Sequence, residues 1–165
     1  MIKFLLLIFL FTLFSIIAHA QPIIEEAFSP YQGATELVVK TIGEAQKTVR
    51  VAAYSFTSRP IAQALVSACN HGAEVQIVFD KSQSTNRFIS QSFDGTCVQT
   101  RFNDRYSIMH DKFVIVDDSE LETGSFNFTG AAQSRNAENV IVIHDDFKTI
   151  DAYRHQWEKL WDEAK

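Results

Sequence analysis

Short runs rich in Val and Ile alternate with amphipathic stretches along most of the chain, and this alternation constrains the fold more than any other feature. Runs such as "TVRVAAYS" and "EVQIVFD" have the length and composition of strands, and helix-like stretches separate several of them. Strands and helices in succession are typical of an α/β fold. We predict a mixed, largely parallel β-sheet flanked by helices, with strands at about 23–28, 48–55, 74–80, 97–102, 109–117, 120–126 and 139–144.

Helices are predicted between several of these strands. The stretch "GATELVVKTIGEAQ" places its apolar residues on one face, and "RPIAQALVSACNHG" begins near Pro60 and ends at Gly72. A last helix, at about 146–163, carries an apolar stripe that we interpret as core. The stripe consists of Phe147, Ile150, Tyr153, Trp157, Leu160 and Trp161. The polar segment 81–96 is predicted to be a loop, with a short helix as the alternative.

The first twenty residues, "MIKFLLLIFLFTLFSIIAHA", have the pattern of a signal peptide. Lys3 supplies the basic opening, an apolar run follows, and small residues stand at Ala18 and Ala20. A retained membrane anchor is the alternative, but the apolar run is shorter than the ~20 residues that span a bilayer. We predict that residues 1–20 are cleaved and that residues 21–165 form a single domain, periplasmic or secreted, with no stable membrane anchor.

Net charge limits how this chain can bind a polyanion. Removing residues 1–20 removes one base and no acid, so the net charge changes from −5 to −6. A nucleic acid would therefore have to bind a local basic patch. The candidates for that patch lie in predicted loops or at the ends of elements, where a solvated charge is the simpler interpretation of each one. They are Arg59, Lys81, Arg87, Arg101, Arg105 and Arg135.

The two cysteines, Cys69 and Cys97, both lie after the predicted cleavage site. Disulfides persist in the compartments that exported proteins reach. We predict a Cys69–Cys97 disulfide, with two separately buried thiols as the alternative. The sequence has no Cys and His spacing typical of a zinc site, and we expect neither a metal nor another cofactor.

The stretch "IMHDKFVIVDDSELETGSFNFTG", residues 108–130, carries the candidate chemistry. If 109–116 is a strand, the alternation of side chains puts His110 and Lys112 on one face and Asp117 on the other. An acidic turn and a returning strand would then bring Ser125 and Asn127 beside them. Glu138, at the start of the next predicted strand, would lie close enough to accept a hydrogen bond from the ring of His110.

This set of residues suits the hydrolysis of a phosphate diester. Lys112, Ser125 and Asn127 can donate hydrogen bonds to phosphate oxygens as charge develops on them. A neutral imidazole at His110 can attack phosphorus, and a carboxylate at Glu138 would fix the tautomer of the ring. The alternative for His110 and Lys112 is a polar strand face at the edge of a sheet without a catalytic role. The downstream "GSFN" favours the catalytic interpretation.

The pattern His110-x-Lys112, then Asp117, then Gly124-Ser125-x-Asn127 resembles the HKD motif of the phospholipase D superfamily. Upstream, "VRVAAYSFTSRPIAQAL" and "GAEVQIVFD" are similar to small bacterial endonucleases of that superfamily. The resemblance implies a phospholipase D-like fold and hydrolysis through a phosphohistidine.

Carried over residue by residue, the resemblance makes His110 the nucleophile or general acid and Glu138 its partner. Lys112, Ser125 and Asn127 match the phosphate-binding residues. Asp117 belongs to the motif, but its strand phase makes us interpret it as a structural turn residue. We predict that Tyr54 and Phe56 are core; the alternative for Phe56, at the end of its strand, is a place in the wall of the cleft.

We therefore expect an exported, metal-independent endonuclease that cleaves DNA, with RNA as a further substrate class, without sequence preference. The chain carries one copy of the motif, so one chain offers one catalytic histidine. Since displacement at phosphorus needs a nucleophile and an acid, we expect a homodimer with a composite active site. The alternatives are a phospholipase D acting on lipid head groups and a non-catalytic nucleic-acid-binding protein.

Overall fold

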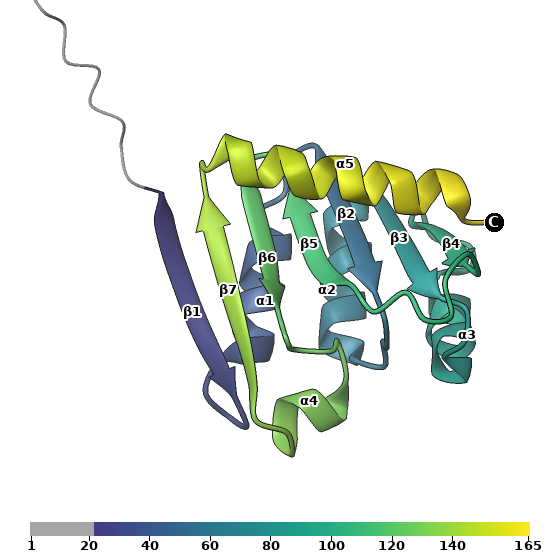
Figure 1. The fold of residues 1–165 in the computed structure, drawn as a ribbon, viewed down its shortest axis with the longest axis horizontal. Helices are drawn as coiled ribbons and strands as arrows, with labels where there is room; N and C mark the ends of the chain where they lie inside the picture. Colours follow the sequence, from purple (N-terminus) through teal and green to yellow (C-terminus); the bar gives the residue numbers. More distant parts are fainter. Residues whose placement is uncertain (1–21) are drawn as a thin grey trace, which may run out of the picture.

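The computed structural model describes residues 22–165, whose strands form one sheet in the order β1-β7-β6-β5-β2-β3-β4 (Figure 1). The strands are β1 (Ile23–Ser29), β2 (Thr48–Ala53), β3 (Glu74–Asp80), β4 (Gln99–Asn103), β5 (Lys112–Val116), β6 (Glu120–Gly124) and β7 (Glu138–His144). The helices are α1 (Ala34–Gly43), α2 (Arg59–Asn70), α3 (Ser84–Ser90), α4 (Gly130–Ser134) and α5 (Phe147–Glu163), and a 3₁₀ turn spans Gln91–Phe93. The predicted signal peptide, residues 1–20, lies outside the described residues.

The strand pairing confirms a mixed sheet flanked by helices and corrects the expectation that the sheet is largely parallel. Within the described sheet, β2 and β3 are parallel, as are β3 and β4, and the other four neighbouring pairs are antiparallel. Helices α2 and α3 supply the crossovers that parallel strands require. The turn at 117–119 between β5 and β6 is too short for such a crossover, so these strands form a hairpin.

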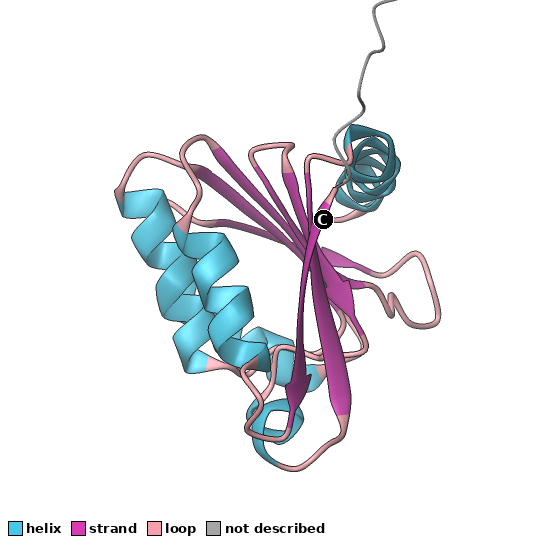
Figure 2. Ribbon diagram, turned by 90° about the vertical axis from the view of Figure 1, so that its left-hand side faces the viewer, coloured by secondary structure: helices cyan, strands magenta, loops and turns pink. Residues whose placement is uncertain are grey.

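Helices pack on both faces of the sheet. Figure 2 shows α1 and α2 side by side on one face and α5 crossing the other. The first core lies under α1 and α2 and includes Val38 and Leu65, and the second lies under α5 around Trp157 and Leu160. Most of the predicted stripe of α5 packs against this second core, but Phe147 is 64% exposed. The segment predicted as a loop contains α3, so the short-helix alternative describes it better.

A disulfide joins Cys69, near the end of α2, to Cys97, just before β4, as the sequence predicts. The two Cα atoms are 6.0 Å apart, and the sequence separation of the cysteines is 28. The bond ties α2 to the strand at one edge of the sheet, because β4 is the last strand in the sheet order.

The ends of β5, β6 and β7 position the motif residues. Strand β5 begins at Lys112 rather than at 109, so His110 stands on the irregular segment 104–111 that precedes the strand. At the end of β6, a Cβ atom added to Gly124 would lie 2.1 Å from the backbone oxygen of Asn139. Position 124 therefore requires glycine, because β6 approaches the backbone of β7 closely just before Ser125.

Candidate active site

All five predicted site residues line one cleft of about 520 Å³: His110, Lys112, Ser125, Asn127 and Glu138. Thr123, Gly124 and Tyr153 complete much of its wall. A larger and more apolar groove of about 590 Å³ lies between α2 and α3 and contains none of the five. We place the candidate site in the smaller cleft, because the groups able to perform chemistry on a phosphate converge there.

His110 and Lys112 meet as the spacing predicts, although only Lys112 belongs to the strand. The Nζ atom of Lys112 lies 3.0 Å from Nδ1 of His110 and donates a hydrogen bond of 2.6 Å to the backbone oxygen of His110. Both ring nitrogens of His110 lie near the cation, since Nε2 is 3.5 Å from Nζ.

The side chain of Lys112 is buried, whereas that of His110 is exposed to solvent. Burial lowers the pKa of Lys112 below its ordinary value, although the nearby carboxylates of Asp111 and Glu138 act to raise it. The cation therefore lies in a poorly hydrated position, where interaction with a phosphate oxygen is strengthened.

Ser125 and Glu138 are joined across the ends of β6 and β7. The hydroxyl of Ser125 donates to Oε2 of Glu138 at 2.6 Å, and the amide of Asn136 donates to Oε1 at 3.0 Å. The predicted hydrogen bond between Glu138 and His110 is not among those formed within residues 22–165. Ser125, at the end of the neighbouring strand β6, bonds to Glu138 instead of His110. Asn136 is a second partner of Glu138, which the sequence analysis did not predict.

Asn127 follows Ser125 by two residues and lines the same cleft, as predicted. Its Oδ1 atom is buried and has no hydrogen-bond partner among the described residues. Oδ1 can only accept a hydrogen bond, so the amide N–H group of Asn127 is the part of the side chain that can donate to a phosphate oxygen.

Asp117 points away from the cleft, as its strand phase predicts. Its carboxylate accepts hydrogen bonds from the backbone N–H groups of Gln46, Lys47 and Thr48 at 2.7, 2.8 and 2.7 Å. Burial acts to raise the pKa of Asp117, but these three donors outweigh it and the pKa lies below its ordinary value. The residue thus anchors the β5–β6 turn, where it has a φ of 52°, to the start of β2.

Tyr54 is the residue at this site that sequence reasoning placed wrongly. The sequence predicts it to be core, but it is only partly buried, and its ring centroid lies 4.3 Å from that of His110. Phe56, the predicted candidate for the cleft wall, is fully buried against Phe79 and Phe128. Strand β2 ends at Ala53, so alternation no longer predicts side-chain direction at these positions.

The candidate basic residues divide into two groups. Lys81 forms an ion pair with Asp104, and Arg101 stacks on Trp161 at 4.2 Å, so both have structural partners. The others form no ion pair within the part of the chain that the structure describes. They are Arg59, Arg87, Arg105 and Arg135.

Comparison with known proteins decides the family. Residues 38–161 match the sequence model of the family described as "Cardiolipin synthase, PLD-like domain". The chain belongs to the phospholipase D superfamily. The protein is a phosphodiesterase of this superfamily.

Two solved structures share the fold of this phospholipase D superfamily member. Nuc from Salmonella typhimurium, a phospholipase D family member, is 34% identical, with a TM-score of 0.84 over 88% of this chain and 97% of its own. NucT from Helicobacter pylori is 25% identical, with a TM-score of 0.75 over 86% of this chain and 98% of its own.

A sequence relative carries a different name. The phospholipase D of Rickettsia bellii is 33% identical over 135 residues, which cover 81% of this chain and 67% of that protein. Our chain thus spans about two thirds of that relative but nearly the whole of Nuc. Within residues 22–165, none of the helices combines the length and the apolar composition needed to cross a membrane.

Proposed function

We propose that this superfamily member is an exported endonuclease that hydrolyses DNA, with RNA as a further substrate, without sequence preference and without a metal. The observation that carries the proposal is the cleft in which the His110 ring, the buried Lys112 cation and the Ser125 and Asn127 side chains converge. These groups supply a nucleophile and the donors that a phosphate diester needs. The similarity to Nuc over 97% of that chain supports this assignment.

The proposed reaction proceeds in two steps through a phosphohistidine. First, a lone pair of an imidazole nitrogen of His110 forms a bond to phosphorus, the bond to the leaving oxygen breaks, and that oxygen takes a proton from a second imidazolium. Next, this second imidazole, now neutral, accepts a proton from water as the water oxygen bonds to phosphorus and the P–N bond breaks. Lys112, Ser125 and Asn127 stabilise the phosphate oxygens in both steps.

Glu138 is proposed to orient His110 in this reaction. In the structure its carboxylate accepts hydrogen bonds from Ser125 and Asn136 at the start of β7. A substrate phosphate that takes the hydroxyl of Ser125 would free Oε2 of Glu138 to accept a hydrogen bond from the ring N–H of His110. The orienting role therefore belongs to the substrate complex in this proposal.

The second imidazolium is proposed to come from another copy of the chain. One chain places one histidine in the cleft, and a two-fold axis through that cleft would set His110 of two copies on opposite sides of the phosphorus. The proposed protein is therefore a homodimer with a composite active site.

A nucleic-acid substrate is supported by arginines that form no ion pair within residues 22–165. Arg105 lies on the segment that leads to His110, and Arg135 lies three residues before Glu138. Such cations can hold a phosphate backbone without reading bases. Export to the periplasm or the medium is supported by the pattern of residues 1–20 and by the disulfide.

Hydrolysis of a phospholipid head group is the second candidate, because the Rickettsia relative is named phospholipase D. The deciding experiment incubates the purified protein with plasmid DNA, RNA and phosphatidylcholine vesicles, each with and without EDTA. We expect DNA cleavage in EDTA and no cleavage by His110→Ala. Release of choline without DNA cleavage would favour the lipase, and loss of DNA cleavage in EDTA, restored by magnesium, would refute the proposed chemistry.

A further inference from the structure

His110 needs support from outside its own segment. It stands on the irregular segment 104–111, where no strand ladder holds the backbone, and its side chain is exposed. A nucleophile must nevertheless be held close to its reactive geometry, since a misplacement of about 1 Å can cost on the order of a hundredfold in rate. A cluster of three residues beside this segment, two of them buried, is linked to it by hydrogen bonds and ring contact.

The first member of the cluster is Asp80, the last residue of β3, which is 1% exposed. Its Oδ2 accepts a hydrogen bond of 2.5 Å from the backbone N–H of Met109, the residue before His110. Its Oδ1 accepts from the backbone N–H groups of Ser82 and Gln83 at 2.8 and 3.2 Å. One buried carboxylate thus fixes the backbone beside the catalytic histidine to the end of β3.

The second member is Asn86, on α3, which is fully buried. Its amide nitrogen donates to the backbone oxygens of Tyr54 and Asp80, both at 2.9 Å. Its Oδ1 accepts from the N–H of Phe56 at 2.9 Å. Asn86 therefore bridges the end of β3 and the segment that follows β2.

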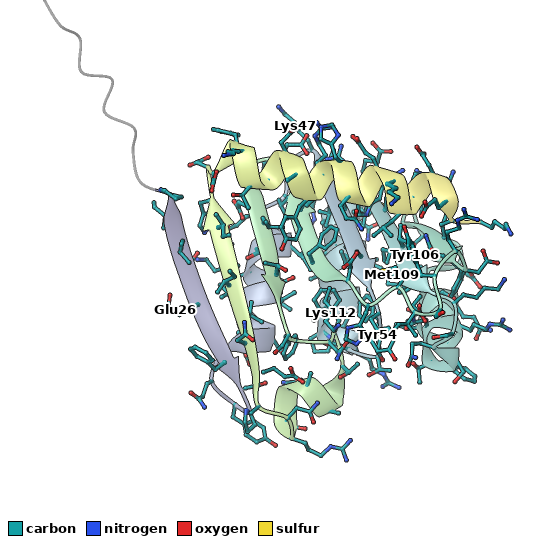
Figure 3. All side chains as sticks on the ribbon, viewed as in Figure 1. Glu26, Lys47, Tyr54, Tyr106, Met109 and Lys112 are labelled. Carbon is teal, nitrogen blue, oxygen red and sulfur yellow. A yellow bond between two sulfur atoms is a disulfide. The ribbon has the colours of Figure 1, made fainter. Side chains whose placement is uncertain are left out.

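The third member, Tyr54, contacts the nucleophile itself. Its ring lies against that of His110 with an angle of 50° between the planes, and Nζ of Lys112 is 5.2 Å from its centroid. Its hydroxyl accepts a hydrogen bond of 2.9 Å from Gln83, and its N–H donates to the backbone oxygen of Asp111 at 3.1 Å. Figure 3 shows Tyr54 and Lys112 together, with Met109 on the adjoining segment.

We propose that Asp80, Asn86 and Tyr54 form a positioning unit that sets the orientation of the His110 ring. Asp80 holds the backbone on one side of His110, and Tyr54, held by Asn86, supplies the surface against which the ring packs. The proposal rests on the proposed function in taking His110 as the nucleophile. None of the three residues contacts the phosphate in this account, so they act through His110.

The experiment compares Tyr54→Leu, which removes the aromatic surface, with Tyr54→Phe, which keeps it and loses only the hydroxyl. Tyr106→Leu is the matched control, because Tyr106 lies on the same segment as His110 but contacts Lys159 instead. Turnover is measured on bis(p-nitrophenyl) phosphate, a diester too small to depend on distant contacts. Thermal unfolding of each variant establishes that it is folded.

We expect Tyr54→Leu to lower kcat by about ten- to a hundredfold while KM changes by less than about twofold, because orientation rather than binding is lost. Tyr54→Phe should retain most of the kcat, and Tyr106→Leu should match the wild type. Asp80→Asn, which keeps the shape but weakens the bond to Met109, should shift kcat in the same direction as Tyr54→Leu. An unchanged kcat in Tyr54→Leu would overturn the proposal.

A second readout does not require activity. In protein labelled with ¹³C-histidine, the ring resonance of His110, assigned with His110→Ala, should shift and broaden in Tyr54→Leu but not in Tyr106→Leu. An unchanged resonance would overturn the positioning role even if the enzyme is active. If the wild type hydrolyses no diester, the proposed function fails, and the resonance still decides whether Tyr54 orients the ring.

Discussion

Glu122, a buried carboxyl outside the active site, should make the stability of this protein depend on pH. It is 1% exposed in the middle of β6, where its strand neighbours are the fully buried Val114 and Val142. Its Oε2 has no hydrogen-bond partner among the described residues. Burial raises the pKa of Glu122 well above its ordinary value, because ionisation in an apolar core is costly.

The sign and size of the effect follow from this pKa. The folded protein holds the proton of Glu122 more tightly than the unfolded chain, so stability is full below the unfolded pKa of about 4.5 and falls as pH rises. Until the pH reaches the folded pKa, the loss is about 1.4 kcal/mol for each pH unit. Glu122→Gln cannot ionise, so its free energy of unfolding should lack this slope.

The assay is urea unfolding of wild type and Glu122→Gln at a series of pH values from 4 to 8, followed by tryptophan fluorescence. The difference between the two free energies isolates Glu122, since the other titrating groups are common to both proteins. Glu26→Gln, a substitution at an exposed glutamate of β1, is the matched control and should follow the wild type (Figure 3). Parallel curves for wild type and Glu122→Gln above pH 5 would refute the reasoning.

Four further predictions concern the site and its supports. Lys112→Ala should lower kcat on the order of a hundredfold or more with the fold retained; unchanged turnover would remove it from the transition state. Replacing Cys69 and Cys97 by Ala should lower the free energy of unfolding by roughly 2–4 kcal/mol, and non-reducing peptide mass spectrometry should find the bond in the wild type. Asp117→Ala should cost about 2–3 kcal/mol in chemical denaturation without a direct effect on catalysis, since three backbone donors lose their acceptor. When wild-type and His110→Ala chains are co-refolded, activity should follow the square of the wild-type fraction, whereas a linear dependence in mixed dimers would show that each chain works alone.

Much of the site could be predicted because its residues are close in sequence and lie near short strands. The two-residue spacing of His110 and Lys112 and the hairpin turn between β5 and β6 bring the motif together locally. The hydrogen-bond partners of Glu138 could not be predicted. The expected strand arrangement puts three polar residues, Ser125, Asn136 and His110, near the start of β7, and the sequence does not indicate which of them bonds to Glu138. Which of them bonds to it depends on the relative positions of strand ends, and local patterns do not define these.

The sequence by itself determined the α/β class, the approximate positions of the strands and the set of residues that line the cleft, because periodicity and motif spacing are local properties. Only the tertiary structure decided that most strand pairs are antiparallel, that Tyr54 packs on His110, and that Asp80 holds Met109 from 29 residues away. It also decided that a glutamate at the centre of β6 is buried. These features depend on which segments pack together, and the free energy of that packing is shared among residues distant in sequence.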